Sequence, residues 1–449
     1  MSTETPPPRA LTRLPDGWHW RRLKFLARVQ TGMAKGKDHG GAATVEVPYL
    51  RVANVQDGYL ALDDVATMPV PEADLPRYRL QPGDVLMNEG GDFDKLGRGH
   101  VWHGQIDPCI HQNHVFAVRP YGVSPEWLNA YTGSSPAQFY FMGRAKQSTN
   151  LASISSSNLM ELPVPVPPAE TQCLMLDWLD REAARIDALI EKKTHFIELL
   201  REKRQAVITA AVTTGFDSGA AMVESGDGRL GCIPSHWKVR PLKYVARVQT
   251  GIAKGKDVAG RETVEVPYLR VANVQDGFVD LTDVANIAIP VEDLERYLLQ
   301  PGDVLMNEGG DFDKLGRGHV WQGEIDPCIH QNHVFAVRPT GVSSNWLNAY
   351  TSSAPAQFYF MGRSKQSTNL ASISSANLME LPVPIPPETE QGAILAALTE
   401  RLTALDRLTE TNARSIGLLR ERRAALITAA VTGQIDVRAE QPASTLEPQ

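Results

Sequence analysis

Residues 81–102 read QPGDVLMNEGGDFDKLGRGHVW, and residues 300–321 read the same letters without one change. This identity belongs to a longer repeat, because Gly32 matches Gly251 and Leu200 matches Leu419, each pair 219 residues apart. A solenoid repeat is only roughly 20 to 50 residues long. Each copy should therefore be a domain of its own, and the 449-residue chain is a tandem duplication with pseudo-twofold symmetry.

Within each copy the sequence changes character at a proline-rich hinge, LPVPVPP at 162–168 and LPVPIPP at 381–387. Before the hinge, short β-type runs such as 45–55 and 115–119 are separated by Gly and Pro, and a helix is expected around 127–131. After it, residues 169–214 contain neither Pro nor Gly. We therefore predict a mixed α/β domain, mainly strand, followed by one long helix that Gly215 caps.

The two long helices carry apolar stripes that need a partner. In the first, the stripe comprises Leu179, Ala183, Ile186, Ile190, Ile197, Leu200, Val207 and Ala211, and in the second Leu398, Leu402, Leu405, Ile416, Leu419, Leu426 and Ala430. A domain of ordinary size cannot cover so long a helix, so the expected partner is the other helix. A whole domain separates them in sequence, which allows an antiparallel coiled coil, with Thr409 and Asn412 as polar positions that set register. The alternative is that each helix packs only on its own domain.

Composition excludes several classes of protein. The chain has 45 Lys+Arg against 52 Asp+Glu, a net charge of −7, so any nucleic-acid binding must come from local basic surfaces. No apolar stretch is long enough to span a bilayer, and residues 1–10, MSTETPPPRA, lack the features of a signal peptide. We expect a cytoplasmic protein without membrane contact. The four cysteines form no CxxC pair, which argues against a zinc site.

Four polar loops, present in both copies, are the candidate binding sites. GMAKGKD at 32–38 lacks the spacing and the Ser or Thr of a phosphate-binding P-loop, and favours contact with a phosphate backbone or plain surface. HQNH at 111–114 runs into a strand, where residues i and i+3 face opposite sides, so metal binding is disfavoured. Its Asn and Gln side chains suit adenine in the major groove, the alternative being a polar network beside the core.

The other two loops add cations. NEGGDFDKLGRG at 88–99 places Lys95 and Arg98 among glycines, a pattern that fits insertion into a groove because Arg is the commonest reader of guanine. GRAKQSTN at 143–150 offers the cationic and hydroxyl side chains that contact phosphates, or it is an exposed linker. The candidate DNA contacts are Lys35, Lys37, Asn88, Lys95, Arg98, His111, Gln112, Asn113, His114, Arg144, Lys146, Gln147 and Asn150 in the first copy, and Lys254, Lys256, Asn307, Lys314, Arg317, His330, Gln331, Asn332, His333, Arg363, Lys365, Gln366 and Asn369 in the second.

Signatures of catalysis are absent from the sequence. No Asn/Asp-Pro-Pro-aromatic motif of an adenine methylase occurs, and neither does GxSxG or HExxH. The acids of DFDK could suggest a metal-dependent nuclease, but no upstream acid completes such a site. We predict a non-catalytic chain with no metal. Two alternatives stay open, a coiled-coil adaptor without a role in DNA binding and, more remotely, a nuclease acting through Asp92.

LPDGWHWRRLKFLARVQTG at 14–32, LPVPVPPAETQ at 162–172 and LLREKRQAVITAAVTTG at 199–215, all present twice, resemble the specificity subunit of type I restriction-modification systems. The resemblance implies two target recognition domains on double-stranded DNA, separated by an antiparallel coiled coil that sets the spacer. It also implies two partner methylase subunits, which carry S-adenosylmethionine, and nuclease/translocase subunits; this chain itself holds no cofactor. The predicted boundaries are 11–165 and 230–384 for the recognition domains, 166–215 and 385–435 for the helices, 216–229 for a linker and 436–449 for a disordered tail.

The two copies are more alike than that family pattern requires. Like domains related by a twofold axis should read the same half-site on opposite strands, so we predict an inverted-repeat target with an unspecified spacer. The copies diverge mainly at 39–43 against 258–262 and at 59–79 against 278–298. Any difference between the half-sites would arise in these stretches.

Overall fold

The structure is a computed structural model that falls into two compact units. Unit 1 comprises residues 1–193 and 414–449, and unit 2 comprises residues 194–413. The structure describes residues 14–36, 43–91, 96–97, 99–148, 151–255, 260–310, 315–316, 318–367 and 370–437, with the backbone alone at 147, 148, 151, 366, 367 and 370. Each unit therefore contains one globular copy and part of both long helices.

The two long helices confirm the prediction from sequence. Helix α5 spans Ala169–Thr213 and α10 spans Glu388–Val431. Both begin directly after a pair of prolines, which lack the N–H that a helix interior needs. Both end before a glycine with a left-handed backbone, since φ is +69° at Gly215 and +72° at Gly433. Glycine adopts this conformation without the clash that a Cβ would cause, so it terminates the helix as predicted.

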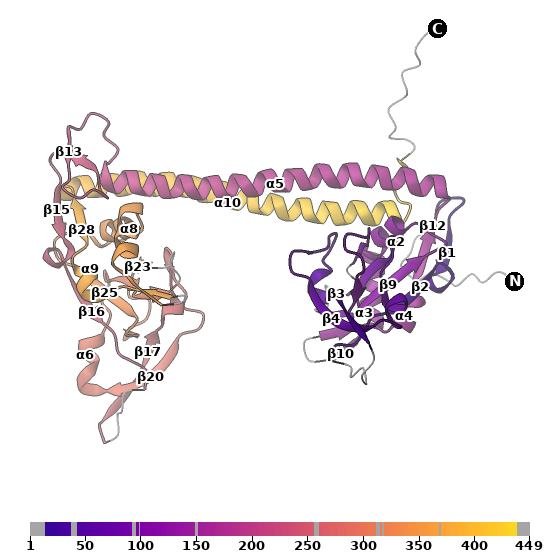
Figure 1. Cartoon of the computed structure of the whole chain (residues 1–449). Coiled ribbons are helices and arrows are strands. Elements are labelled where there is room, and N and C mark those ends of the chain that lie inside the picture. Colours follow the sequence, from indigo (N-terminus) through magenta and orange to yellow (C-terminus); the bar gives the residue numbers. More distant parts are fainter. Residues whose placement is uncertain are drawn as a thin grey trace, which may run out of the picture. The chain divides into compact units, whose positions relative to one another are not determined.

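Within each unit the helix segments pack antiparallel (Figure 1). In unit 2, Ile208 near the end of α5 shares a buried cluster with Leu398 near the start of α10. In unit 1 the order reverses, because Leu179 near the start of α5 shares a cluster with Ala430 near the end of α10. The predicted stripe residues of both helices are buried or half-buried. Each helix end also packs on the core of the globular copy in the same unit, so both the other helix and a globular copy contribute to burial.

The polar positions of α10 are satisfied within the helix. Thr409 Oγ1 donates to the Leu405 carbonyl at 3.0 Å, and Asn412 Nδ2 donates to the Leu408 carbonyl at 2.8 Å. Hydrogen bonds of this kind remove the cost of placing a polar group near an apolar seam. Their role in setting the register of the pair remains a prediction.

The globular part of unit 1 is mainly strand. Its strands are β1 His19–Arg22, β2 Ala27–Thr31, β3 Thr44–Leu50, β4 Ala66–Pro71, β5 Val85–Asn88, β6 Gly90–Gly91, β7 Gly99–Val101, β8 Ile110–His111, β9 Val115–Pro120, β10 Lys146–Ser148, β11 Leu151–Ser153 and β12 Pro163–Val166. Its helices are α1 Leu75–Tyr78, α2 Pro125–Thr132, α3 Ser135–Arg144 and α4 Ser156–Met160, with 3₁₀ turns at Leu23–Phe25 and Val52–Asn54. The predicted helix near 127–131 is thus α2, and the predicted strand at 115–119 is β9. The β-type run at 45–55 is a strand only as far as Leu50, where β3 ends, because Val52–Asn54 forms a 3₁₀ turn.

Unit 2 repeats this order and adds the strands β13, β14, β18 and β19 and one 3₁₀ turn. Its strands are β13 Met222–Glu224, β14 Cys232–Pro234, β15 Lys238–Pro241, β16 Ala246–Thr250, β17 Thr263–Leu269, β18 Val274–Gln275, β19 Phe278–Val279, β20 Ala285–Pro290, β21 Val304–Asn307, β22 Gly309–Gly310, β23 Gly318–Val320, β24 Ile329–His330, β25 Val334–Pro339, β26 Lys365–Ser367, β27 Leu370–Ser372 and β28 Pro382–Ile385. Its helices are α6 Leu294–Tyr297, α7 Ser344–Thr351, α8 Ala354–Arg363 and α9 Ser375–Met379, with 3₁₀ turns at Leu242–Tyr244, Val271–Asn273 and Val291–Asp293.

The core of each copy lies on both faces of a four-stranded antiparallel sheet. In unit 1 the strand order is β2-β9-β5-β7, and β5 is buried along its whole length. Side chains alternate along a strand, so Val85 and Met87 join the cluster that reaches α5 and α10, whereas Leu86 joins a second cluster with Trp102. A second sheet, β4-β3-β8, carries the parallel pair β3–β8.

The structure revises two expectations about the connecting segments. The proline-rich hinge is part of the fold, because β12 pairs antiparallel with β1 and β28 pairs with β15. The linker expected at 216–229 contains β13, which pairs with β14. Prolines tolerate such edge positions in two-stranded sheets. The other domain boundaries remain predictions, and the predicted tail lies outside the described residues from position 438 onward. No helix among the described residues is both long and apolar enough to cross a membrane.

Candidate DNA-recognition surface

The HQNH motif does not form one row of accessible groups. His111 ends β8 and is fully buried, whereas His114 is exposed in the turn that leads to β9. The Nδ1 of His111 lies 2.6 Å from the Val115 carbonyl, which can only accept, so Nδ1 carries the proton. Burial lowers the pKa of His111 to about 4, and His330 in the second copy repeats this environment. Each of these two buried histidines stabilises the turn that follows it through this hydrogen bond to a backbone carbonyl.

Asn88 and Asn307 are also inside the fold. Asn88 is 3% exposed, and its Nδ2 donates to the Val55 carbonyl at 3.0 Å. Asn307 makes the same bond to Val274. Their burial, like that of His111 and His330, keeps these side chains from reaching a ligand at the surface in this structure. Motif spacing does not indicate this burial, because the geometry of the turn decides which polar residues of a motif face inward.

The accessible candidates come together on adjacent loops. Met33 in the loop after β2 donates its N–H to the His111 carbonyl, and Asn113 donates its N–H to the Met33 carbonyl at 3.1 Å. Lys35 lies in the same loop as Met33, so this pairing brings the loop that carries Lys35 next to the β8–β9 turn. Lys35 and His114 are exposed, and Asn113 is half-buried. The second copy repeats the arrangement with Lys254, Asn332 and His333, while Gln112 and Gln331 lie half-buried at the base of the turns.

Two more cations lie on or next to the sheet β10-β11-β6, which the chain enters directly after β5. The chain passes from β5 through Glu89 into β6, which pairs with β11, and β11 pairs with β10. Lys146 on β10 and Arg144 at the end of α3 are exposed, as are Lys365 and Arg363. We call Lys35, Asn113, His114, Arg144 and Lys146, with their equivalents in unit 2, the loop cluster. It concentrates cations and amides on a chain whose net charge is negative.

An acid that the sequence reasoning missed lies at this cluster. The carboxylate of Glu89 is 3.0 Å from His114 Nδ1, and that of Glu308 is 2.7 Å from His333 Nδ1. The residues of each pair are 25 positions apart in sequence and meet because β5 pairs with β9. The only available signal was the pairing of the two strands, which motif spacing does not show.

Several candidates cannot be placed. Lys37, Lys95, Arg98, Asn150, Lys256, Lys314, Arg317 and Asn369 lie outside the described residues, and so do the side chains of Gln147 and Gln366. The same holds for Asp92, the residue on which the nuclease alternative depends. Their roles remain predictions.

The loop cluster depends on a close approach at Gly32. A Cβ built at Gly32 would lie 2.1 Å from the His111 carbonyl oxygen, and one at Gly251 would lie 2.0 Å from that of His330. Backbone atoms cannot move aside as a flexible side chain can. We expect Gly32→Ala to lower the free energy of unfolding of unit 1 by about 2 kcal/mol, through a forced shift of backbone.

Urea unfolding measures this effect, and Gly143→Ala is the matched control. Gly143 has open space around its Cβ position and lies within α3. Alanine there should leave stability unchanged or raise it slightly, because it favours helix. Equal stability of Gly32→Ala and the natural protein would contradict the close approach.

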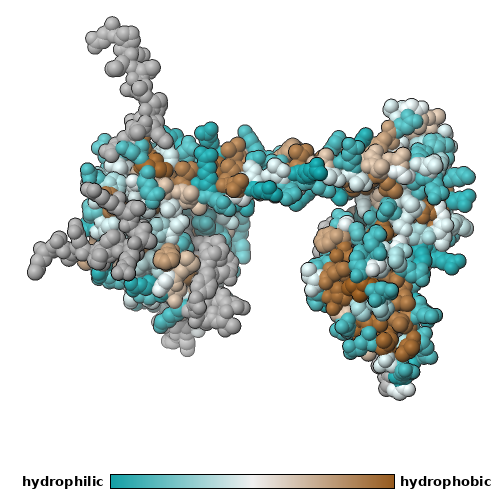
Figure 2. All heavy atoms as spheres, turned by 180° about the vertical axis from the view of Figure 1, so that it is seen from behind, coloured by the Kyte–Doolittle hydropathy of each residue, from teal (hydrophilic) through white to brown (hydrophobic). Residues whose placement is uncertain are grey.

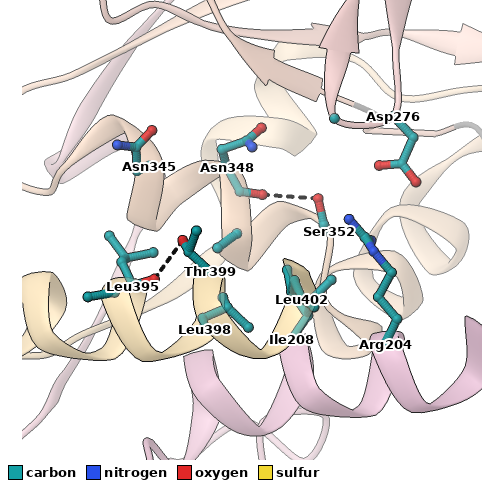
Figure 3. A pocket seen from close by; sticks show the side chains of 13 residues that line it. Arg204, Ile208, Asp276, Asn345, Asn348, Ser352, Leu395, Leu398, Thr399 and Leu402 are labelled. Carbon is teal, nitrogen blue, oxygen red and sulfur yellow. Dashed lines mark hydrogen bonds between the residues drawn. The ribbon is translucent and has the colours of Figure 1, made fainter. Parts of the chain in front are cut away.

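A groove of about 540 Å³ lies in unit 2 between α7 and the segments of α5 and α10 (Figure 3). Ile208, Leu398 and Leu402 give it an apolar floor, and Thr399 and Asn345 lie on its rim. The Oδ1 of Asn348 is buried and has no hydrogen-bond partner within the described part of the chain. The groove combines residues from three helices and from the turn between β18 and β19, so no sequence motif pointed to it.

The surface of unit 2 also carries apolar residues. Figure 2 shows them gathered on the visible face of its globular part. Large apolar side chains that are exposed in this unit include Phe358 at 66%, Tyr244 at 66% and Phe278 at 54%. Exposed apolar patches mark surfaces that bind other molecules. Unit 2 therefore offers apolar contact area in addition to the polar loop cluster.

Two strand-rich modules with matching loop clusters, each packed on one end of both long helices, define a duplicated recognition protein. Comparison with known proteins shows what the chain is similar to. Residues 234–416 match the model of the type I restriction modification DNA specificity domain. The putative type I restriction enzyme MjaX specificity subunit of Methanocaldococcus jannaschii is 24% identical over 95% of both chains. The EcoKI specificity subunit of Escherichia coli is 20% identical over 96% of this chain and 92% of its own length.

Solved structures show the same fold. The HsdS subunit from Thermoanaerobacter tengcongensis aligns over 94% of this chain and 99% of its own, with a TM-score of 0.51 and 16% identity. A structure described under complex assembly and conformational transition of the type I R-M system aligns over 94% of this chain and 100% of its own, with a TM-score of 0.62 and 18% identity. Residues 234–416 thus match the type I restriction modification DNA specificity domain, and the chain is similar to specificity subunits of type I restriction enzymes over nearly its whole length.

Proposed function

We propose that this chain reads a bipartite DNA target for a type I restriction-modification complex. The observation that carries the proposal is the loop cluster, which presents the same exposed cations and imidazole and the same half-buried amide in each unit. Lys and Arg neutralise phosphates, and Asn binds the edge of adenine in the major groove. Similarity to a DNA specificity domain and to specificity subunits of type I restriction enzymes supports the same role.

The two half-sites should be equal. Every exposed member of the loop cluster is identical between the copies. The longer divergent stretch, 59–79 against 278–298, contains β4 and β20, which are edge strands of the sheets β4-β3-β8 and β20-β17-β24. Strand β3 thus separates β4 from β8, the strand that leads into the turn with Asn113. An inverted repeat with an unspecified spacer is the target that this arrangement favours.

Partner subunits supply the chemistry in this proposal. Two methylase subunits that carry S-adenosylmethionine dock along the helices, and nuclease/translocase subunits join them, while this chain is non-catalytic and holds no cofactor. The groove beside α7 and the apolar face of unit 2 give such partners surfaces to bury. Because the chain is acidic overall, its own affinity for DNA should be modest and should rise when the partners complete the complex.

The decisive experiment maps methylated adenines across the genome. Cells that express this chain with its neighbouring methylase are compared with cells that lack only this chain. We expect a bipartite inverted-repeat motif that disappears with the chain. An asymmetric motif would keep the recognition role and contradict the equal half-sites. An unchanged methylation pattern would contradict the recognition role and favour the adaptor alternative.

A further inference from the structure

Glu89 and Glu308 are unexpected in a surface that faces phosphates. The Glu89 side chain is 28% exposed and the Glu308 side chain is 26% exposed, and each lies beside the histidine of its loop cluster. A carboxylate near DNA repels the phosphate backbone and therefore weakens binding, so it is expected there only if it has a specific role. The same acid occupies the same place in both copies, and its contacts indicate its role.

The backbone fixes this carboxylate in place. Glu89 donates its N–H to the His114 carbonyl at 2.9 Å, and its own carbonyl accepts the N–H of Ile154 at 2.9 Å. The residue therefore joins the end of β5 to the start of β6 and is held from two sides. Its side chain then reaches His114 Nδ1 at 3.0 Å. Backbone and side-chain hydrogen bonds therefore join the acid to the residue that carries the imidazole.

The hydrogen bonds of His114 determine its tautomer. A carboxylate can only accept, so Nδ1 donates to Glu89. The other nitrogen, Nε2, lies 3.5 Å from Asn113 Nδ2, and the corresponding distance in the second copy is 3.4 Å. An amide nitrogen donates, so Nε2 accepts. Both contacts agree with a neutral imidazole protonated on Nδ1, and they link carboxylate, imidazole and amide into one chain.

We infer that Glu89 and Glu308 are positioning residues for base recognition, acting through the histidine on Asn113 and Asn332. This rests on the proposed function, because it requires that the β8–β9 turn faces DNA. One N–H of the Asn113 amide is directed to His114, which leaves the second N–H and Oδ1 to bind adenine N7 and N6. A side chain oriented before binding loses less entropy when it binds. The acid thus contributes selectivity at one base pair of each half-site.

The test uses the complete methylase complex and duplexes with single base-pair changes at every position of the mapped target. Glu89→Ala together with Glu308→Ala should lower discrimination at one adenine–thymine pair per half-site about tenfold. Discrimination at the other positions should persist, and binding to unrelated DNA should not weaken, because a negative charge has been removed. Glu89→Gln with Glu308→Gln should retain most of the discrimination, since the amide oxygen can still accept from Nδ1.

Two further pairs of variants keep the test decisive. His114→Gln with His333→Gln changes exposed side chains, so folding should persist. This pair of substitutions must lower discrimination at the same base pair. Glu46→Ala with Glu265→Ala removes the same charge from exposed positions on β3 and β17 and should change no base preference. A loss spread evenly over all positions, or unchanged discrimination in the alanine pair, would overturn the inference. Failure of the proposed function would show differently, as absence of sequence-dependent binding by the natural complex.

Discussion

Replacement of Asp84 by alanine should lower the free energy of unfolding of unit 1 by about 3 kcal/mol, among the largest effects expected of one substitution in the globular copy. Asp84 is fully buried at the start of β5. Its two carboxylate oxygens accept from Arg119 Nε at 2.6 Å and from Arg119 Nη2 at 2.7 Å. The same carboxylate accepts the N–H of Gln81 at 2.8 Å, so three donors depend on it.

The partner is less buried than the acid, which sets the size of the effect. The Arg119 side chain is 37% exposed, so water can rehydrate the guanidinium when the carboxylate is removed. Asp84 raises the pKa of Arg119, mainly because its carboxylate accepts hydrogen bonds from the guanidinium. The reverse change, Arg119→Ala, leaves a buried carboxylate without its cation. It should cost at least as much, because an uncompensated buried charge is the more expensive defect.

Urea unfolding of the single variants and of the double variant measures this pair as a double-mutant cycle. We expect the double variant to be less destabilised than the sum of the two single variants, because neither partner is then left alone. Asp303 and Arg338 form the same pair in unit 2, at 2.7 Å, and serve as an internal repeat of the measurement. Additive single effects would show that the two groups do not stabilise each other.

The architecture could be predicted well from the sequence, because a duplicated chain contains the same structural pattern twice. The constant offset defined the copies, and the absence of Pro and Gly between Ala169 and Thr214 predicted a helix that ends one residue away from the expected position. The apolar stripe predicted which helix face is buried, since helical periodicity depends on local spacing alone. These features need no knowledge of tertiary contacts.

The candidate site was less predictable, because burial of a polar residue depends on the tertiary turn around it. His111 and His114 belong to one motif, yet one is fully buried and the other is exposed. The pairing of β5 with β9, which brings Glu89 to His114, follows from sheet order and not from spacing. The proline-rich hinge was likewise not predicted to be a strand, because its partner strand β1 lies far away in sequence.

The buried histidines make the stability of each unit depend on pH. Burial is the main reason that the pKa of His111 falls to about 4, whereas an unfolded histidine titrates near 6.5. The folded pKa is the lower one, so the unfolded chain binds the extra proton between these values. Stability is therefore complete above about pH 6.5 and falls as the solution is acidified toward pH 4.

This difference in pKa corresponds to about 3 kcal/mol for each buried histidine over the whole interval, and to about 2 kcal/mol between pH 7.5 and pH 5. His330 has the same lowered pKa of about 4, so both units should weaken over the same range. The neighbouring groups act in opposite directions, because Asp84 raises the pKa of His111 and Arg119 lowers it, and burial outweighs both.

Urea unfolding at a series of pH values from 7.5 to 5 tests this, with His111→Asn as the matched variant. Asparagine places an amide nitrogen near the position of Nδ1, so it can still donate to the Val115 carbonyl, which accepts from His111 at 2.6 Å. Its side chain does not titrate, and the variant should lose part of its stability at neutral pH but most of the decline on acidification in unit 1. His330→Asn should act in the same way on unit 2 alone. An equally steep decline in His111→Asn would mean that other groups carry the pH dependence, and the burial of a neutral His111 would not be its cause.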